Sequence, residues 1–292
     1  MELCRKYSMI KNILLIGGSG YLGTAIMKRF ISEIDFNITV GDLSGPVIPG
    51  KKFLKLDVLD INAVYKCIRE YDLIINCAGQ ITSPITTCFE INTQGIDNIV
   101  NAVKSFDKKI IHISTVAVYG TISYADEMSP INPESSYAAC KAFAEYNIKS
   151  ILPENSFCIM RTANLYGEKQ KKGLFAYLLR TYLSGEKLHF NNDGSLTRYF
   201  LHVNDCANAV LSAVRNNLYG VYNVATNDKY NINGIIALIE NTCKTKFITE
   251  FEDTKPIENI DKLNFDAFGK VSGFEPQIIL MEFINKIFSK HV

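Results

Sequence analysis

A tyrosine and a lysine four positions apart, Tyr137 and Lys141, are the side chains in this sequence that are best suited to proton transfer. In a helix this spacing sets both residues on one face, one turn apart. A free phenol has a pKa of about 10, and a neighbouring cation favours the phenolate. Such a pair can take a proton from an alcohol or return one to a ketone. The spacing alone is weak, because Tyr7 and Lys11 share it.

A glycine-rich turn near the start of the chain predicts a dinucleotide site. The pattern G-x-x-G-x-x-G directly follows the apolar run Asn12–Ile16 and precedes a helical pattern. Such a turn lets the backbone approach a pyrophosphate and aims a helix N-terminus at it. An ordinary glycine-rich turn between a strand and a helix is the alternative. The residues that we assign to this turn are Gly17, Gly20, Tyr21, Leu22 and Gly23.

Two aspartates follow the next apolar runs. Asp42 lies 19 residues after Gly23, close to the spacing of about 20 expected for a carboxylate that binds the adenosine ribose hydroxyls. A carboxylate there would repel a 2′-phosphate, which favours NAD over NADP as the cofactor. Asp57 ends the third run and, with Val58, is assigned to the adenine side. The alternative for each aspartate is a residue that only caps a turn or loop.

Small and hydroxyl-bearing residues follow two later runs. Cys77, Ala78 and Gly79 would let a dinucleotide lie across the strand ends, and Gln80 beside them is assigned to the substrate. The hydroxyl of Thr115 can donate a hydrogen bond to a substrate oxygen or accept one from it. A β-branched residue that merely finishes a strand is the alternative for Thr115.

Short apolar runs alternate with helical patterns in the first half of the chain, which predicts a parallel α/β sheet covered by helices on both faces. The predicted strands are Asn12–Ile16, Asn37–Val40, Phe53–Leu56, Leu73–Asn76, Lys109–Ile113 and Phe157–Met160. The predicted helices are Gly20–Ile34, Ile61–Glu70, Ile91–Phe106 and Tyr137–Leu152. Beyond residue 165 the pattern predicts a smaller, mainly helical part, with a strand at Val221–Val224 and helices at Leu174–Leu183, Asn204–Arg215, Ile232–Cys243 and Ile278–Ser289.

The overall composition indicates a soluble globular protein. The net charge of +1 gives no reason to expect nucleic acid or a membrane surface as a partner. The eight cysteines are scattered and contain no C-x-x-C pair, so we expect reduced thiols and a cytoplasmic location. The four histidines show no metal-ligand spacing, and we predict no metal site; His112 and His202 are interpreted as core histidines.

Taken in order, these segments resemble the extended short-chain dehydrogenase/reductases, and more narrowly the NAD-dependent epimerase/dehydratase group that acts on nucleotide sugars. The resemblance includes three later segments and runs from about Lys11 to Val224. It excludes the Tyr7–Lys11 pair, which precedes the first strand. The matching segments are Gly17–Gly23, Asn76–Gly79, Ser114–Gly120, Tyr137–Lys141, Arg161–Gly167, Thr197–Asp205 and Gly220–Val224.

The resemblance implies a Rossmann-type doubly wound sheet and a role for each site residue. Tyr137 would be the catalytic acid/base, Lys141 would bind the nicotinamide ribose and lower the pKa of Tyr137, and Thr115 would hold the reacting hydroxyl. Asn92 matches the helix asparagine of the family's proton relay. Asn164 and Arg198 would contact the substrate diphosphate, for which a planar guanidinium is suited. A surface ion pair is the alternative for Arg198.

The resemblance also implies how the chain is divided and assembled. Residues 8–165, completed by about 199–226, would bind NAD. Residues 166–198 and 227–292 would bind the nucleotide-diphosphate sugar. A homodimer would form through the helices at Ile91–Phe106 and Tyr137–Leu152.

Departures from the family pattern narrow the chemistry. Sugar-nucleotide 4,6-dehydratases carry an acid pair after the threonine, whereas this chain has Val116 and Ala117 there. Tyr199 and Glu168 replace an aspartate and a frequent proline. In the family, the arginine of a late R-P segment binds the diphosphate. The nearest counterpart in this chain is Lys255-Pro256. Because of these substitutions, the resemblance does not identify the nucleotide or the sugar of the substrate.

The sequence therefore predicts an NAD-dependent nucleotide-sugar epimerase, acting at C4 through a 4-keto sugar. The second hypothesis is a nucleotide 4-keto-sugar reductase that uses the same three residues in one direction. The third is a non-catalytic dinucleotide-binding regulator, which would be expected to have lost Tyr137 or Lys141. Retention of both residues disfavours it.

Overall fold

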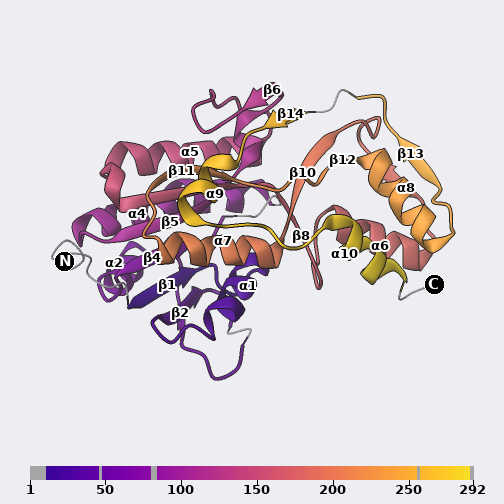
Figure 1. Ribbon diagram of the computed structural model, residues 1–292. Coiled ribbons are helices and arrows are strands. Elements are labelled where there is room, and N and C mark those ends of the chain that lie inside the picture. Colours follow the sequence, from indigo (N-terminus) through magenta and orange to yellow (C-terminus); the bar gives the residue numbers. More distant parts are fainter. Residues whose placement is uncertain (1–10, 46–47, 80–83, 255–256, 290–292) are drawn as a thin grey trace.

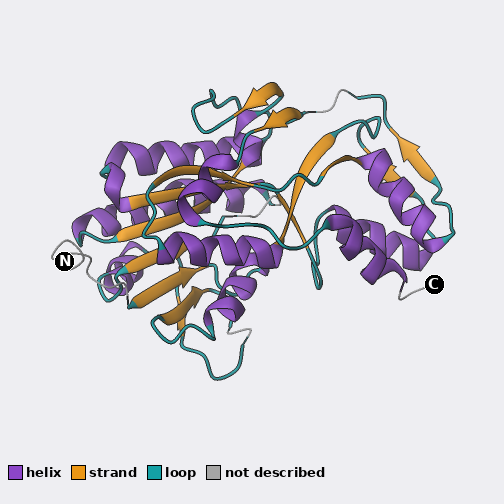
Figure 2. Ribbon diagram, in the orientation of Figure 1, coloured by secondary structure: helices purple, strands orange, loops and turns teal. Residues whose placement is uncertain are grey.

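A seven-stranded parallel sheet forms the centre of the molecule, in the order β11-β7-β5-β4-β1-β2-β3 (Figures 1 and 2). The structure is a computed structural model and describes residues 11–45, 48–79, 84–254 and 257–289. All neighbouring strands of this sheet pair in parallel, with β1 between β2 and β4. The strands are β1 (Asn12–Ile16), β2 (Asn37–Asp42), β3 (Phe53–Lys55), β4 (Leu73–Asn76), β5 (Lys109–Thr115), β7 (Phe157–Thr162) and β11 (Gly220–Val224).

Helices cover both faces of this sheet, as the sequence predicts. The side chains of β1 show why: Ile13 and Leu15 join one hydrophobic cluster, and Leu14 and Ile16 join another. Each buried aliphatic side chain contributes about 1.5–3 kcal/mol to folding, so a strand buried on both faces holds two helical layers. One layer contains α1 (Tyr21–Phe30), α7 (Val203–Arg215) and α9 (Asp266–Ser272), and the other contains α2 (Ile61–Ile68), α4 (Ile96–Ser105) and α5 (Ser136–Ile151).

The predicted helix Ile91–Phe106 has a different form in the structure. It consists of a π-helical turn, Ile91–Gly95, followed by α4, and the helix α3 (Ile85–Glu90) precedes it. Helix α1 also ends at Phe30 rather than at Ile34, which is almost fully exposed. Such π-helical turns frequently occur at functional sites.

A third hydrophobic cluster lies in a smaller part of the molecule, on the right in Figure 1. Its aromatic centre contains Tyr166, Phe175, Phe200 and Phe283. Besides helices it holds strands that the hydrophobic pattern did not predict. Four of them have only three residues, whereas β10 has six. Its elements are α6 (Leu174–Ser184), α8 (Ile232–Cys243), α10 (Leu280–Phe288), β8 (Asn164–Tyr166), β9 (Leu188–Phe190), β10 (Thr197–His202), β12 (Lys229–Asn231) and β13 (Thr249–Phe251).

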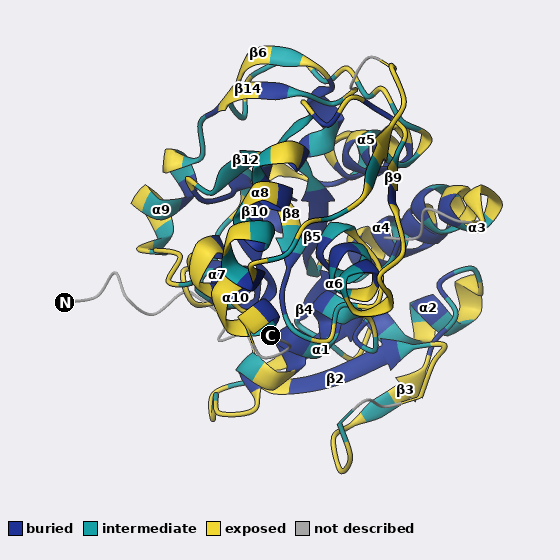
Figure 3. Cartoon of the chain, turned by 90° about the vertical axis from the view of Figure 1, so that its right-hand side faces the viewer, coloured by how far each residue is buried: buried dark blue, intermediate teal, exposed yellow. Residues whose placement is uncertain are grey.

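The chain returns to the larger part after β13. Strand β14 (Ile260–Leu263) pairs with β6 (Ile122–Ala125), at the top of Figure 1. Phe268 of α9 is buried in the same cluster as β1 and α7. The segment 227–292, expected to belong to the substrate-binding part throughout, therefore packs partly on the larger one. Strand β14 has buried residues at both ends and exposed ones between them (Figure 3).

Two further observations concern the described part of the chain. No helix there is both long enough and apolar enough to cross a membrane. Its seven cysteines are free thiols, five of them buried. Two short 3₁₀ turns, Val116–Tyr119 and Glu154–Ser156, complete the secondary structure.

A buried ion pair ties helix α5 to the sheet. Arg161 of β7 is 1% exposed, and its Nη2 lies 2.6 Å from Oε2 of Glu145 on α5. The Ser114 hydroxyl of β5 donates a hydrogen bond of 2.5 Å to Oε1 of Glu145. Arg161 also donates to the hydroxyl of Tyr119, at 2.8 Å. These bonds lower the pKa of Glu145 against the effect of its burial, so the carboxylate stays ionised inside the protein.

We expect Arg161→Met to lower the free energy of unfolding by about 3–5 kcal/mol, because it leaves the Glu145 carboxylate buried without its cation. Denaturation in urea measures this change. The double variant Arg161→Met/Glu145→Gln leaves neither charge and should lose less stability than the single variant. A single variant as stable as the wild type would contradict this account.

Candidate active site

The glycine turn between β1 and α1 is packed too tightly for side chains. Gly17 has φ +75°, and a Cβ there would lie 2.8 Å from the backbone nitrogen of Ala78. A Cβ on Gly23 would lie 2.3 Å from the carbonyl oxygen of Gly17. Gly20 caps α1 without a side-chain hydrogen bond to the helix. The turn therefore presents backbone to whatever lies at the helix N-terminus, which is suited to an anion.

Asp42 lies at the end of β2, beside this turn. Its Oδ2 accepts a hydrogen bond of 3.0 Å from the backbone N–H of Ser19, and its Oδ1 accepts one of 3.0 Å from that of Ser44. Asp57 accepts from the N–H of Leu59 at 2.9 Å, so it caps a loop, as the alternative interpretation proposed. Val58 is buried, and its carbonyl accepts from Nδ2 of Asn98 at 2.9 Å.

The loop after β4 is held by Asn92 of the π-helical turn. Nδ2 of Asn92 donates to the carbonyl oxygens of Gly79 and Cys88, each at 2.8 Å. Gly79 has φ +96°, and a Cβ there would lie 2.4 Å from Oδ1 of Asn92. Asn92 thus positions the backbone that follows Ala78. Gln80 lies outside the described residues.

Helix α5 begins at this same edge of the sheet. The hydroxyl of Ser135 accepts from the N–H of Ala138 at 3.2 Å, which caps the helix and sets Tyr137 in its first turn. Lys141 follows one turn later and is 2% exposed. At the end of β5, the hydroxyl of Thr115 accepts from the N–H of Ala117 at 3.2 Å. Thr115 and Tyr137 are both half-buried.

Burial dominates the ionisation of the Tyr137–Lys141 pair. It raises the pKa of Tyr137 above its usual range, and the nearby Cys88 and Glu258 raise it further. It lowers the pKa of Lys141 to about 8, against the opposing effects of Cys77 and Glu145. In the protein alone, the lowered pKa that we expected for Tyr137 is therefore absent. Lys141 titrates near neutral pH instead.

His112 contacts Lys141 directly, which the sequence interpretation missed. It is 1% exposed, as expected of a core histidine. Its Nε2, however, lies 3.2 Å from Nζ of Lys141, and its Nδ1 lies 3.2 Å from Nδ2 of Asn76. Burial, and then the charge of Lys141, holds the pKa of His112 well below its usual range. The available signal was its position, two residues before Ser114 on the strand that ends at Thr115.

Arg198 and Asn164 lie on adjacent strands at the entrance to the smaller part. Nδ2 of Asn164 donates to the carbonyl of Tyr199 at 3.3 Å. Arg198 donates to the carbonyls of Ile257 and Glu258, at 3.3 and 2.5 Å. Its guanidinium also lies 3.6 Å from the Glu258 carboxylate, and burial lowers the pKa of Arg198.

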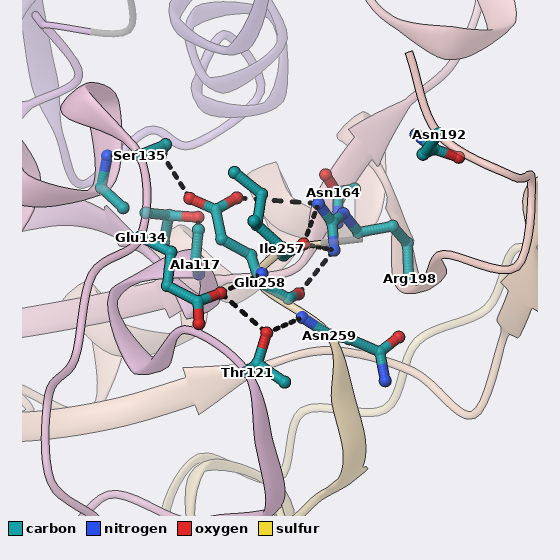
Figure 4. Close-up of polar contacts among 12 residues, drawn as sticks. Ala117, Thr121, Glu134, Ser135, Asn164, Asn192, Arg198, Ile257, Glu258 and Asn259 are labelled. Atoms are coloured by element: carbon teal, nitrogen blue, oxygen red, sulfur yellow. Dashed lines mark hydrogen bonds and ion pairs between the residues drawn. The ribbon is translucent and has the colours of Figure 1, made fainter. Parts of the chain in front are cut away.

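Glu258 joins this arginine to the start of α5 (Figure 4). Its carboxylate accepts a hydrogen bond from the hydroxyl of Ser135, the residue that caps α5. Its N–H donates to the carboxylate of Glu134 at 2.5 Å, and this carboxylate also accepts from Thr121 at 2.7 Å. Glu258, Glu134 and Ser135 were not predicted as site residues, because the link between them spans more than 120 residues of sequence.

The two positions after Thr115 carry no ionisable group. Val116 is 5% exposed and packs in the cluster shared with β1, and Ala117 is half-buried. Both lie in the 3₁₀ turn Val116–Tyr119. The site therefore contains a hydroxyl, a phenol and an amine, with no carboxylate at these two positions to remove a carbon-bound proton.

The model of the family described as "NAD dependent epimerase/dehydratase family" matches residues 13–225. The chain belongs to this family. It is an NAD-dependent enzyme of the extended short-chain dehydrogenase type, and the predicted family, fold and cofactor are confirmed.

Individual members of the family resemble the chain over most of its length. An N-acetyl-alpha-D-glucosaminyl-diphospho-ditrans,octacis-undecaprenol 4-epimerase of Escherichia coli O157:H7 is 27% identical, over 91% of this chain and 82% of its own. The fold is similar to that of UDP-glucuronic acid 4-epimerase from Bacillus cereus, with TM-score 0.82, 20% identity, and 96% and 99% of the two chains covered. It is equally similar to dTDP-glucose 4,6-dehydratase from Bacillus anthracis, with TM-score 0.82, 21% identity, and 96% of each chain covered.

The residues at this sheet edge fit NAD. Gly17 and Gly23 leave a cradle that a Cβ would fill, and α1 points an N-terminus without a side-chain cap toward it. Asp42 ends the neighbouring strand, where a ribose hydroxyl would be recognised. Lys141 provides a buried amine beside the end of β4.

We expect Gly23→Ala to weaken NAD binding at least about tenfold, because the added methyl group would overlap the Gly17 carbonyl and force the turn apart. Isothermal titration of the purified protein with NAD measures this change. Gly45→Ala is the matched control, since a Cβ at Gly45 has no heavy atom within 4 Å. Unchanged affinity in Gly23→Ala would contradict the assignment of this turn to the cofactor.

Proposed function

We propose that this enzyme is a nucleotide-sugar epimerase that inverts the configuration at C4. The proposal rests on three residues: Thr115 at the end of β5, and Tyr137 and Lys141 in the first two turns of α5, which packs against β5 and the turn that follows it. The relatives include enzymes named as sugar 4-epimerases, among them one from Escherichia coli O157:H7, and this supports the choice.

In this proposal each residue performs a separate task. Thr115 orients the C4 hydroxyl by hydrogen bonding, and Tyr137 removes its proton as the ketone forms. Lys141, in its protonated form, stabilises the phenolate of Tyr137. NAD, when bound, would supply the hydride acceptor and, for the return transfer, the hydride donor. The 4-keto sugar must turn within the site and present its other face before hydride returns, and Tyr137 then gives the proton back to the C4 oxygen.

The substrate is a diphosphate-linked sugar in this proposal. Arg198 has a planar guanidinium suited to two phosphate oxygens, and Asn164 lies on the adjacent strand. The Bacillus cereus neighbour was solved with UDP-glucuronic acid and NAD, and the Escherichia coli relative is named for a lipid-linked diphosphate sugar. We infer a nucleoside diphosphate as the group that carries the sugar, because the similarity covers 99% and 96% of the Bacillus cereus and Bacillus anthracis nucleotide-sugar enzymes.

Elimination of water is disfavoured. A 4,6-dehydratase needs an acid and a base to remove the C5 proton and the C6 hydroxyl. Val116 and Ala117 occupy the positions of the acid pair in those enzymes, and Val116 is buried against the core. The similarity to the Bacillus anthracis dehydratase thus concerns the fold.

The second candidate is a 4-keto-sugar reductase, because the same three residues would protonate a ketone after reduction. Asp42 disfavours a reductase that uses NADPH, because the Asp42 carboxylate would repel the 2′-phosphate of that cofactor. An epimerase needs no net reductant, whereas a reductase consumes one NADH or NADPH for each turnover.

Our prediction for catalysis is that the wild type converts a UDP- or dTDP-sugar to its C4 epimer without added reductant. Tyr137→Phe should turn over about 10²–10⁴-fold more slowly, because it removes the proton acceptor. NMR spectroscopy of the sugar measures the conversion, and Tyr65→Phe on α2 is the control. Consumption of NADH with a keto-sugar, and no epimer without it, would favour the reductase.

We also propose a division of labour and a homodimer. Residues 8–165 and about 199–226, with the returning segment at 260–272, would bind NAD, and residues 166–198 with the rest of 227–292 would bind the sugar.

Helices α3 and α5 pack together and expose Phe89, Phe143 and Tyr146. Tyr146 is 69% exposed on α5, and such adjacent apolar side chains are typical of an interface.

We expect the wild type to sediment at the mass of two chains and the variant Phe143→Glu/Tyr146→Glu at that of one. The introduced carboxylates would be desolvated and would repel each other across a twofold axis. Analytical ultracentrifugation measures the masses, and Leu183→Glu, an equally exposed position on α6, is the control. A double variant that still sediments as a dimer would place the interface elsewhere.

A further inference from the structure

A row of buried polar groups leads from the loop after β4 to the catalytic lysine. The N–H of Ala78 donates to Oδ1 of Asn76 at 3.0 Å. Nδ2 of the same amide lies 3.2 Å from Nδ1 of His112, and Nε2 of His112 lies 3.2 Å from Nζ of Lys141. Asn76, His112 and Lys141 are all 3% exposed or less. Because these groups are buried, the row is stable only if each hydrogen-bond donor faces an acceptor.

The Ala78 N–H fixes the orientation of the amide. It can only donate, so the oxygen of Asn76 must face it and the NH₂ group must face His112. An NH₂ group can also only donate, so Nδ1 of His112 must accept and cannot carry a proton. His112 is therefore neutral, with its proton on Nε2. The lowered pKa of His112 agrees with this assignment.

The tautomer of His112 then acts on Lys141. The N–H at Nε2 points along the 3.2 Å contact with Nζ. An ammonium group has three donors and no acceptor, so a charged Lys141 would set two donors against each other. A neutral amine has a lone pair and accepts the hydrogen bond from Nε2. The row is fully hydrogen-bonded only when Lys141 is uncharged.

The other groups around Lys141 do not reverse this preference. Cys77 follows β4, Cys88 lies on α3, and Cys140 and Glu145 lie on α5. Burial raises the pKa of the Cys77 thiol to about 12 and that of Cys88 above its usual value, so these two thiols are neutral at physiological pH. The Glu145 carboxylate is bonded to Arg161, Ser114 and Lys149. Its charge is largely compensated by the Arg161 guanidinium.

We propose that Asn76 and His112 are positioning residues that favour the neutral amine of Lys141 in the protein alone, so that Lys141 loses its proton at a lower pH than a free lysine. A ligand that offers Nζ an acceptor in place of the Nε2–H of His112 would raise the pH at which Lys141 loses its proton. The pair thereby sets the pH at which Tyr137 and Lys141 work together. This last consequence rests on the proposed function, whereas the protonation state itself does not.

The test is the titration of Lys141 in cofactor-free protein, followed by NMR of ¹³C-labelled lysine side chains. The Lys141 signal is assigned by its loss in Lys141→Arg. For the wild type we expect a midpoint near the pKa of about 8. Asn76→Asp keeps the acceptor for Ala78 but offers an acceptor to Nδ1, so the proton of His112 moves there and Nε2 accepts from the Lys141 ammonium. The midpoint should rise by at least about one pH unit.

Two further variants separate the tautomer from the added charge. Asn76→Ala removes the NH₂ group without adding a carboxylate, so Nε2 is free to accept and the midpoint should also rise. Asn223→Asp puts a carboxylate at another buried strand end, where Asn223 contacts Tyr119 and Asn264, and should leave the midpoint unchanged. Equal midpoints in the wild type and Asn76→Ala would overturn the proposal, even if Asn76→Asp shifts.

Failure of the proposed function would give a different result. A protein that epimerises no sugar can still show the Lys141 titration and its shift in Asn76→Ala, which supports the positioning pair alone. If the protein is an epimerase, the pH profile of kcat in Asn76→Asp should move with the NMR midpoint. A profile that stays in place while the midpoint moves would overturn the link between this pair and catalysis.

Discussion

The ion pair between Glu145 and Arg161 fixes the helix that carries the proposed acid/base to the sheet that carries its partner. Glu145 lies one turn after Lys141 on the same face of α5, and it accepts a hydrogen bond from Ser114. Ser114 directly precedes Thr115. The distance from Thr115 to the Tyr137–Lys141 turn therefore depends on one buried carboxylate and its guanidinium. Because both charges are enclosed, loss of either one would leave the other uncompensated.

The two buried cations near α5 differ in how they tolerate burial. Arg161 keeps its charge, because Glu145 and Tyr119 provide acceptors for its fork of donors. Lys141 faces a histidine N–H, a set of thiols and a carboxylate already engaged by the arginine. An arginine remains protonated under such conditions, whereas the pKa of a lysine falls. The fold thus uses arginine where it needs a permanent charge and lysine where it needs one that titrates.

The sequence predicts well those features that repeat along the chain. Strands β1, β2, β4, β5 and β7 are largely apolar runs, because each is buried on both faces. Their ends locate Asp42, Thr115 and the glycine turn without any structure. Side chains that meet through tertiary contacts are not predicted in this way. His112 looks like any core histidine until Asn76 and Lys141 are placed on either side of it.

The smaller part shows the same limit for backbone structure. Strands β9, β12 and β13 have three residues each, too few for a period to appear, and their pairing depends on partners far along the chain. Glu258 follows Lys255-Pro256, the nearest counterpart of the family's late R-P segment, yet nothing in the sequence connects it with Arg198. Its partners Ser135 and Arg198 are brought to it only when β14 pairs with β6.

The pairing of β14 with β6 places Glu258 between two parts of the proposed site. Glu258 contacts Arg198, the residue proposed for the diphosphate, and Ser135, the cap of the helix that carries Tyr137. A diphosphate bound at Arg198 would compete with the Glu258 carboxylate for the guanidinium, since both are anions that seek the same donors. A Glu258 released from the arginine would still be joined to Ser135. Charge at the far end of the substrate is therefore connected, through one glutamate, to the first turn of α5, where the proton is exchanged.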